Sequence, residues 1–430
     1  MTVLIVGAGG FIGRHLVAGL RAAGHAVRPA GTDPAALRAL FPGLDPVRAD
    51  YATDDAAAWA PRLAGIDIVV NAAGLIREAP GRSFRRIHAE GPKALFDACR
   101  AARVGKVLQI SALGADAGAE TAYHLSKREA DRHLQALDPT GQRLNWCVLR
   151  PSLVLGPGGA STALFTALAA LPVPPRLGPG DWAVQPIHVD DLVRIVAVLA
   201  AYPGPLPRVL DVVGPEPVTT DGLIRGFRNW LGLPPRPFVP LPAPLLRLAA
   251  GIGDRLPRSP VTSQSLAMLR RGNTAPAEPL VAATGIRPRP LAAQLAALPA
   301  PRAALRTARL DLLRPTLRWS IALLWLWTCA VSLGLWPLSD SLAMVERVGP
   351  TGPLALALTI GAALWDGALG LALALRWRPV LTGGLMLATM AAFTAIISLF
   401  LPEYWLHPFG PVAKNLPLAV ATLVMMALED

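Results

Sequence analysis

The sequence has too few cysteines, and too irregular a spacing of them, for a disulfide framework. Its 430 residues include three cysteines, Cys99, Cys147 and Cys329, an odd number without the short spacing of metal ligands. Disulfide scaffolds need paired cysteines, and zinc sites need ligands at regular short intervals. We therefore expect no metal site, and a reducing compartment for the soluble part of the chain.

Charged residues are also scarce, at 16% of the chain against 53% hydrophobic residues. A soluble enzyme of this size is seldom so apolar, and part of the chain is expected in a membrane. Lysine and arginine outnumber aspartate and glutamate by 41 to 29, and many arginines fall between Arg247 and Arg318. Because no aromatic residues alternate with these arginines, we predict a surface that faces lipid and no nucleic-acid partner.

The N-terminus has no basic region and no cleavage site of a signal peptide, because a glycine-rich turn follows the first apolar run at once. The run 3–6 predicts a buried strand and 14–22 a helix. The turn between them carries Gly7, Gly10, Phe11, Ile12 and Gly13. Glycine lets backbone amides approach a pyrophosphate, and a helix N-terminus attracts the anion. A dinucleotide site is predicted; a structural glycine turn is the alternative.

The choice between NAD and NADP stays open at this stage. Asp33 lies twenty positions after Gly13, where an acidic residue can hold a ribose diol of NAD. Arg14 and Arg28 could instead favour the extra phosphate of NADP. Asp50 follows a short predicted strand, 46–49, and either binds the adenine amino group or caps a turn.

Two later strand ends carry the residues expected at the reaction centre. The predicted strand 66–70 leads to the small residues Ala72, Ala73 and Gly74, which let the chain run flat along a cofactor. The strand 107–110 ends at Ser111. Further on, Tyr123 and Lys127 are four residues apart on a predicted helix, so they share one face. An ammonium group beside a phenol lowers the phenol pKa, which would make Tyr123 a proton-transfer group and Ser111 a group that orients the substrate.

As a set, these residues resemble the short-chain dehydrogenase/reductase superfamily in its extended and atypical branch, similar to the NADH dehydrogenase 39 kDa-type subunit group and to NAD-dependent epimerases and dehydratases. The resemblance covers about residues 1–300. It implies a Rossmann-type doubly wound parallel sheet, with Ser111, Tyr123 and Lys127 catalytic and Lys127 also bound to the nicotinamide ribose. The motifs that carry it are Gly7-x-x-Gly10-x-x-Gly13, Asp50, Asn71-Ala-Ala-Gly74, Ser111, Tyr123-x-x-x-Lys127, Arg150-Pro151 with Gly156-Pro157, and Ile187-His-Val-Asp-Asp191.

The segment 153–299 is predicted to form a small lobe on the substrate side. Within it, His188 is expected to have a structural role. The segment 245–256 alternates leucines with arginines at near-helical spacing, and it is either a packed helix or a helix that lies on a membrane surface. A basic juxtamembrane linker, 301–318, is expected to follow the lobe.

The last quarter, 319–430, predicts an all-α membrane domain with four spans, each about long enough for a ~30 Å hydrocarbon core. These apolar stretches are 319–335, 354–375, 380–401 and 409–428. Basic residues lie before the first span and at Arg376 and Arg378 between the second and third. This pattern predicts an inner-membrane protein with both termini and the N-terminal domain in the cytoplasm.

Two ionisable residues fall inside the predicted spans, Asp366 and Lys414. Such residues are costly in lipid unless they have a partner. Either they pair with each other, or Lys414 extends to the interface while Asp366 meets backbone or water. Trp365-Asp-Gly367, His407-Pro-Phe-Gly-Pro and Lys414-Asn-Leu-Pro417 resemble the DoxX-like family of small four-helix membrane proteins.

Together these features predict a membrane-anchored oxidoreductase or epimerase that uses NAD or NADP. Location beside a bilayer favours a small lipophilic substrate, such as an isoprenoid, sterol-like or quinone compound, with membrane lipid as the other partner. The alternative is a non-catalytic dinucleotide-binding protein with a sensing or assembly role. The sequence leaves the oligomeric state open.

Overall fold

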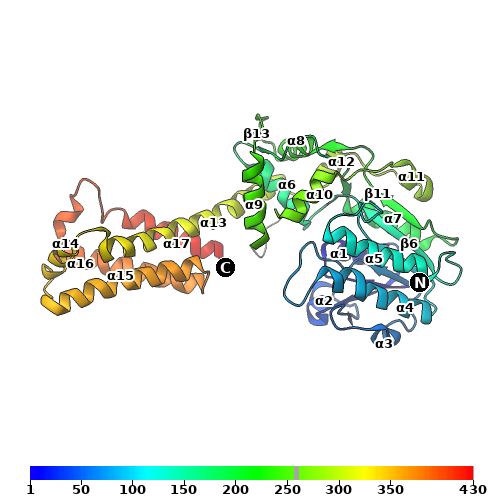
Figure 1. The fold of residues 1–430 in the computed structure, drawn as a ribbon, viewed down its shortest axis with the longest axis horizontal. Helices are drawn as coiled ribbons and strands as arrows, with labels where there is room; N and C mark the ends of the chain where they lie inside the picture. The colour runs from blue at the N-terminus through cyan, green and yellow to red at the C-terminus, as the bar shows by residue number, and fades with distance from the viewer. Residues whose placement is uncertain (256–260, 430) are drawn as a thin grey trace. The chain divides into compact units, whose positions relative to one another are not determined.

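The computed structural model describes residues 1–255 and 261–429. These residues form two compact units that divide between Leu305 and Arg306. The first unit combines a sheet with helices, and the second is helical (Figure 1). Residues 301–318, the predicted basic linker, are the first part of one continuous helix, α13 (Pro301–Ala330).

The first unit is built on a seven-stranded sheet with the order β11-β6-β5-β4-β1-β2-β3, in which all pairs are parallel. The strands are β1 (Thr2–Val6), β2 (Ala26–Gly31), β3 (Val47–Arg48), β4 (Ile68–Asn71), β5 (Lys106–Ile110), β6 (Asn145–Pro151) and β11 (Val209–Val212). Strand order reverses between β1 and β4, and such a point leaves a crevice at the carboxyl ends of the strands. The predicted doubly wound parallel sheet is confirmed.

Helices cover both faces of this sheet, so the strands are apolar on both sides. Val3 and Ile5 of β1 belong to the core under α1 (Phe11–Ala22) and α7 (Val189–Ala201), whereas Leu4 and Val6 belong to the core on the opposite face. The second core includes α4 (Gly91–Ala101) and α5 (Ala122–Leu137). The remaining helical segments of this half are α2 (Pro34–Leu40), α3 (Ala56–Trp59), η1 (Ala60–Arg62) and η2 (Arg85–Glu90).

The segment predicted as a substrate lobe contains short strand pairs and small helices. The strand pairs are β7 (Val154–Leu155) with β10 (Ile187–His188), β8 (Pro175–Arg176) with β13 (Val239–Pro240), and β9 (Ala183–Val184) with β12 (Val218–Thr219). The helices are α6 (Ala160–Ala170), α8 (Thr220–Trp230), α9 (Ala243–Arg255), α10 (Ser263–Arg271), α11 (Glu278–Thr284) and α12 (Leu291–Ala296). His188 accepts the Asp190 N–H at 3.2 Å and thereby caps α7, which confirms its structural role. Leu256, the end of the predicted segment 245–256, lies outside the described residues.

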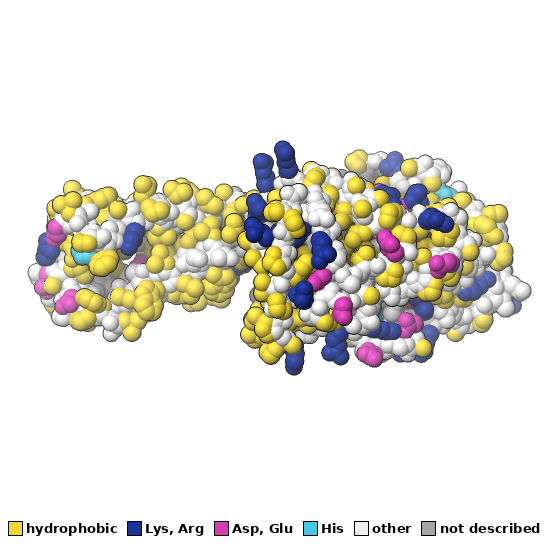
Figure 2. All heavy atoms as spheres, turned by 90° about the horizontal axis from the view of Figure 1, so that it is seen from above, with side chains coloured by type: hydrophobic (Ala, Val, Ile, Leu, Met, Phe, Trp, Pro, Cys, Tyr) yellow, Lys and Arg dark blue, Asp and Glu magenta, His cyan; other side chains and the backbone are white. Residues whose placement is uncertain are grey.

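In the part of the chain that the structure describes, three helical stretches are long and apolar enough to cross a membrane: Pro301–Leu335, which begins in the first unit, Gly352–Ala374 and Pro379–Phe400. The elements after α13, in chain order, are η3 (Val331–Leu335), α14 (Leu338–Glu346), α15 (Gly352–Ala374), α16 (Pro379–Phe400), η4 (Pro402–Trp405) and α17 (Asn415–Glu429). Figure 2 shows a largely apolar surface over the second unit.

The predicted fourth span is wrong in its extent. Helix α17 begins at Asn415 and has 15 residues, which is about 22 Å at 1.5 Å per residue and short of a ~30 Å hydrocarbon core. The preceding segment does not continue the helix, because Pro408 and Pro411 lack the N–H that a helix interior needs and Gly410 has a positive φ of 53°.

Of the two alternatives for Asp366 and Lys414, the structure does not show the pairing of one with the other. Asp366 is buried in α15, whereas Lys414 is exposed in the turn before α17. Across residues 1–255 and 261–429, neither side chain makes an ion pair. The buried carboxylate leaves Oδ1 without a hydrogen-bond partner.

One end of the helical unit is closed by three arginines around the buried side chain of Glu429. Its carboxylate lies 2.8 Å from Arg318 Nη1, 2.9 Å from Arg376 Nη2 and 3.2 Å from Arg314 Nη2. Arg314 and Arg318 come from α13, Arg376 from the turn between α15 and α16, and Glu429 from the last residue of α17. The basic segments expected to share one side of the membrane therefore share one end of this unit.

Candidate active site

The glycine turn after β1 brings two chain segments closer together than any side chain would allow. Gly7 has a φ of +81°, and a Cβ there would lie 2.7 Å from Ala73 Cα. A Cβ at Gly13 would lie 2.1 Å from the Gly7 carbonyl oxygen. Gly10 caps α1 without a side-chain hydrogen bond, and the first turn of α1 carries no acidic residue. Both features suit an anion at this helix N-terminus.

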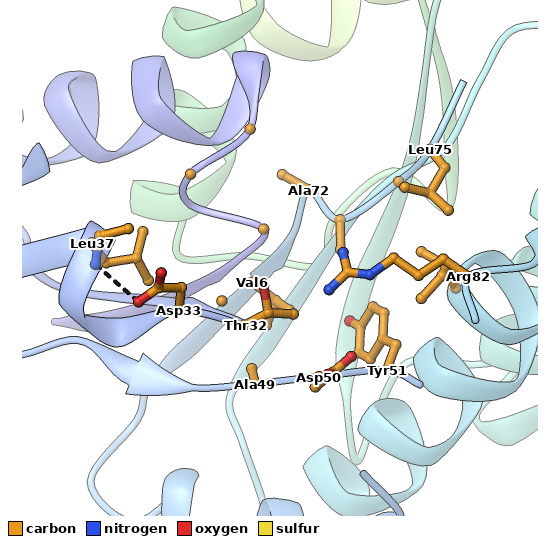
Figure 3. Close-up of a pocket in the computed structure, with 18 of the residues that line it drawn as sticks. Val6, Thr32, Asp33, Leu37, Ala49, Asp50, Tyr51, Ala72, Leu75 and Arg82 are labelled. Atoms are coloured by element: carbon orange, nitrogen blue, oxygen red, sulfur yellow. Dashed lines mark hydrogen bonds between the residues drawn. The ribbon is translucent and has the colours of Figure 1, made fainter. Parts of the chain in front are cut away.

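A cavity of about 340 Å³ opens beside this turn at the carboxyl ends of β1, β2 and β4 (Figure 3). This volume lies within the usual range of cofactor and ligand sites, roughly 300–1,000 Å³. The glycine turn, the end of β2, residues 49–51 and residues 72–75 all contribute to its wall. The predicted cofactor residues that line it are Gly7, Gly10, Asp50, Ala72, Ala73 and Gly74.

The other predicted cofactor residues do not line this cavity. The Phe11 ring lies against the loop at Gly159, where a Cβ would approach Phe11 Cζ to 2.9 Å, and Ile12 packs against the core beneath the sheet. Gly13 lies outside the cavity wall, and its lack of a Cβ permits its close approach to the Gly7 carbonyl oxygen. Tyr123 and Lys127 belong to the neighbouring cluster described below, so their contacts with a cofactor stay predictions.

Of the residues considered for the choice between NAD and NADP, Asp33 lies in the cavity wall and the two arginines do not. Asp33 lines the cavity and accepts the Ala35 N–H at 2.9 Å, which caps α2. Arg28 lies 3.8 Å from Asp45, and neither Arg28 nor Arg14 is part of the cavity wall. Asp50 lines the cavity, and its Oδ1 accepts the Ala52 N–H at 3.1 Å, which caps a turn; its contact with an adenine amino group stays a prediction.

Sequence reasoning missed Arg82, whose guanidinium points into the cavity near Tyr51 and Ala72 (Figure 3). Within the described residues this guanidinium makes no ion pair, although neighbouring Arg85 and Arg86 both pair with Glu90. No spacing rule marks Arg82, because it lies in the loop between β4 and η2. A guanidinium that points into a cavity beside a glycine turn is suited to binding a phosphate group.

We expect Arg82→Gln to weaken dinucleotide binding by about tenfold or more, because a charge-assisted hydrogen bond contributes roughly 1.5–3 kcal/mol. Calorimetric titration of the full chain at fixed salt measures this. Arg85→Gln is the matched control, since the Arg85 side chain is 81% exposed and pairs with Glu90. Equal dissociation constants for the two variants would remove Arg82 from the cofactor site.

Two of the three predicted catalytic residues, Lys127 and Ser111, lie at the ends of β4 and β5. Lys127 Nζ donates to Ala73 O at 3.3 Å and to Ile110 O at 3.2 Å, so it bridges these strand ends. It also approaches Gly74, where a Cβ would lie 3.1 Å from Nζ. Ser111 directly follows β5 and is buried. Lys127 thus stands between the cofactor cavity and the serine.

Asp131 is a second residue that sequence reasoning missed. Ser111 Oγ donates to Asp131 Oδ2 at 2.5 Å, and Arg150 Nε lies 3.8 Å from the same oxygen. Asp131 is completely buried. The spacing of Tyr123, Lys127 and Asp131 at successive intervals of four could have indicated it, because such residues share one helix face.

The pKa of Tyr123 is opposite to the sequence-based expectation. Burial, together with the negative charge of Asp131, raises it to about 12, and Lys127 does not offset these effects. Burial also lowers the pKa of Lys127 and raises that of Asp131. The correction has a simple physical cause: the pocket that brings the cation near also removes the water that would stabilise a phenolate. Tyr123 is therefore a neutral phenol at physiological pH.

Aromatic rings hold the Tyr123 side chain in place. Its ring centroid lies 5.3 Å from that of His88, 5.4 Å from His124 and 5.9 Å from Phe84. His88 Nε2 accepts the Leu75 N–H at 2.8 Å. Burial and the charge of Lys127 lower the pKa of His88 to about 2, so this ring is neutral and structural.

Two family descriptions match the chain. The NAD dependent epimerase/dehydratase family matches residues 3–212, and the DoxX-like family matches residues 322–423. Each match falls within one of the two units that the structure separates.

Among curated proteins, a ceramide reductase of Caulobacter vibrioides is 32% identical over 260 residues, which cover 59% of this chain and 77% of that protein. A 3-diazoavenalumate denitrifying reductase of Streptomyces sp. is 30% identical over 266 residues, covering 55% and 83%. Among solved structures, the UDP-glucuronic acid 4-epimerase of Bacillus cereus with UDP-glucuronic acid and NAD has a TM-score of 0.53 at 18% identity, covering 71% of this chain and 99% of that one. The last comparison concerns the fold alone.

Proposed function

Because the chain belongs to the NAD dependent epimerase/dehydratase family, we propose that it is a membrane-anchored reductase that converts a carbonyl group of a lipid-like substrate to an alcohol. The observation that carries the proposal is the position of Lys127 Nζ, which donates to Ala73 O at the cavity wall and to Ile110 O next to Ser111, with Tyr123 one turn earlier on the same helix. Reduction needs an acid at the carbonyl oxygen, and a phenol with a pKa of about 12 is in the acid form at neutral pH.

In this proposal Tyr123, Lys127 and Ser111 each have one role in the reduction. A dinucleotide held at the glycine turn and the cavity wall would supply the hydride for the carbonyl carbon. Tyr123 donates its hydroxyl proton to the carbonyl oxygen, so that the C=O bond becomes CH–OH and the phenol becomes phenolate. The Lys127 ammonium stabilises that phenolate, and Ser111 orients the carbonyl by turning its hydroxyl from Asp131 to the substrate. Solvent protons restore Tyr123.

NAD(H) is the proposed cofactor. The Asp33 carboxylate lines the cavity at the end of β2, where it favours a ribose diol and repels a ribose phosphate. Arg28, the main candidate for binding that phosphate, is turned to Asp45.

The membrane unit and the relative named ceramide reductase support a lipophilic substrate for this chain. We place the catalytic unit in the cytoplasm, because the arginines around Glu429 gather at one end of the helical unit and basic residues favour the cytoplasmic side. Glu429, at the end of α17, lies at the same arginine-rich end as the start of α13, so in this proposal both ends of the helical unit are cytoplasmic.

The test uses full-length protein in detergent or nanodiscs. Loss of NADH absorbance is followed with long-chain ketones, quinones and short soluble ketones, and NADPH is tested in parallel. The proposal predicts NADH oxidation that depends on a lipophilic carbonyl compound and yields one alcohol for each NADH. Bound NADH that never reacts across the panel would instead support a non-catalytic dinucleotide-binding protein.

Turnover should fall as the pH rises through the Lys127 pKa, which burial places below its ordinary value of 10.5. The sign follows from the chemistry: the active form is the ammonium, and raising the pH removes its charge. The profile of kcat/KM against pH measures this, and Lys127→Arg should move the alkaline loss upward because guanidinium keeps its charge. Lys93→Arg, at a surface pair with Glu129, is the control. An unchanged alkaline limb in Lys127→Arg contradicts the assignment.

A further inference from the structure

Helix α9 presents aliphatic side chains to solvent on the face opposite its buried residues. Leu245 is 50% exposed, Leu248 60% and Ile252 50%, and their spacing places them on one side of the helix. The inward side buries Leu246 and Ala250. A surface helix of a soluble domain usually carries polar residues on its outer face. Within the part of this unit that the structure describes, no other element covers this face of α9.

Exposed arginines lie on α9 and on the segments next to it. Arg247 and Arg255 lie on α9 itself, Arg236 precedes it in an exposed proline-rich segment, and Arg270 is exposed on α10, which packs against α9. Asp254, the one acidic residue of α9, offsets part of this charge; its carboxylate accepts the backbone N–H of Ser263 at 3.0 Å and the Ser263 hydroxyl at 2.6 Å. An aliphatic stripe with arginines near it fits the interface of an anionic lipid bilayer.

The C-terminal end of α9 contacts a loop that borders the cofactor cavity. Arg77 donates to the Gly253 carbonyl at 2.9 Å and also to that of Asp254, so α9 is joined to the loop that follows β4. The neighbouring Ile76 is 65% exposed. Gly74 and Leu75, immediately before it, line the cofactor cavity. A surface that binds lipid at α9 would therefore lie beside the entrance to the reaction centre.

We propose that the outer face of α9, with Ile76, docks on the surface of the bilayer that holds this chain's own apolar helices. The bilayer is the occupant that the observations favour, because the helices of the second unit keep one within reach and the nearby arginines match its anionic headgroups. Docking presents the cleft beside Leu75 to lipid, so that a lipophilic substrate can enter without crossing water. This route into the cleft rests on the proposed function; the docking itself does not.

The first experiment measures docking without using activity. Full-length protein with Leu248→Cys and Cys329→Ala carries an environment-sensitive label at position 248, since Cys99 and Cys147 are buried. In vesicles of phosphatidylcholine and phosphatidylglycerol, brominated acyl chains should quench this label. The matched position is Val198 on α7, 37% exposed, where a label should remain unquenched. Equal quenching at both positions overturns the proposal. A label at position 248 that a second protein copy shields, and that lipid does not quench, also overturns it.

The second experiment measures delivery of substrate. Leu248→Glu with Ile252→Glu should lower kcat/KM for a ketone dissolved in the bilayer by about tenfold and leave the value for a short soluble ketone unchanged. Val198→Glu with Tyr202→Glu, at another exposed surface, is the control. Equal loss for both ketones contradicts the docking role. If the wild-type chain reduces neither ketone, the proposed function fails, while the quenching experiment still decides whether α9 meets lipid.

Discussion

Tyr123→Phe is expected to lower kcat by about 10²–10⁴-fold, the usual contribution of a positioned acid or base, while the dissociation constant of NADH stays nearly unchanged. Phenylalanine keeps the ring that packs against Phe84, His88 and His124 and removes only the hydroxyl. The fold and the cofactor cavity should therefore persist, and the loss should appear in the proton-transfer step. Single-turnover oxidation of bound NADH measures it.

Tyr202→Phe is the control for this substitution, because Tyr202 is 45% exposed at the end of α7. Its turnover should match the wild type. A Tyr123→Phe enzyme that keeps most of its activity would require another acid, and the neighbouring His124 would be the first to test.

Glu429→Gln should destabilise the helical unit by about 3 kcal/mol, because removing the charge leaves the arginines around a buried site without their counterion. We take the lower end of the range for buried ion pairs, since the Arg314 and Arg376 side chains are 34% and 49% exposed. Thermal unfolding of the full chain in detergent, followed by helix content, measures the change.

Glu403→Gln tests whether burial is the cause. Glu403 pairs with Arg347, but both side chains are about half exposed, and such surface pairs contribute about 0–1 kcal/mol. Its unfolding temperature should stay near that of the wild type. Equal shifts in the two variants would mean that the arginine cluster has no special role.

The sequence was sufficient to predict the elements whose chemistry is local. The glycine turn was predicted from the first thirteen residues of the chain, which hold an apolar strand, three spaced glycines and the start of a helix. The structure shows that a Cβ at Gly13 would lie 2.1 Å from the Gly7 carbonyl oxygen. The parallel sheet was predicted from the resemblance to the short-chain dehydrogenase/reductase superfamily, which rests on such local motifs. The helix that carries Tyr123 and Lys127 was also predicted, because a spacing of four is a property of one element.

Properties that depend on distant segments could not be predicted in the same way. The partner of Ser111 is Asp131, twenty residues away, and the pKa of Tyr123 depends on how much water the folded chain excludes. Arg82 enters the cavity from a loop whose path no local pattern defines. The length of α17 was overestimated, because hydropathy records composition and does not record where proline and Gly410 end a helix.

The packing of α1 against α7 limits how far the chain can be shortened. Leu16 and Leu20 of α1 share a core with Leu192 and Val196 of α7, about 175 residues later, and a Cβ at Gly19 would lie 2.1 Å from Val193 Cγ1. A fragment that stops after β6 would keep the glycine turn, Ser111, Tyr123 and Lys127 but leave one sheet face uncovered and β6 as an open edge. The nucleotide-binding half is therefore not an autonomous module. The shortest fragment in which α7 covers the sheet face and β11 pairs with the edge of β6 ends at Val212. The match to the epimerase/dehydratase family also ends there.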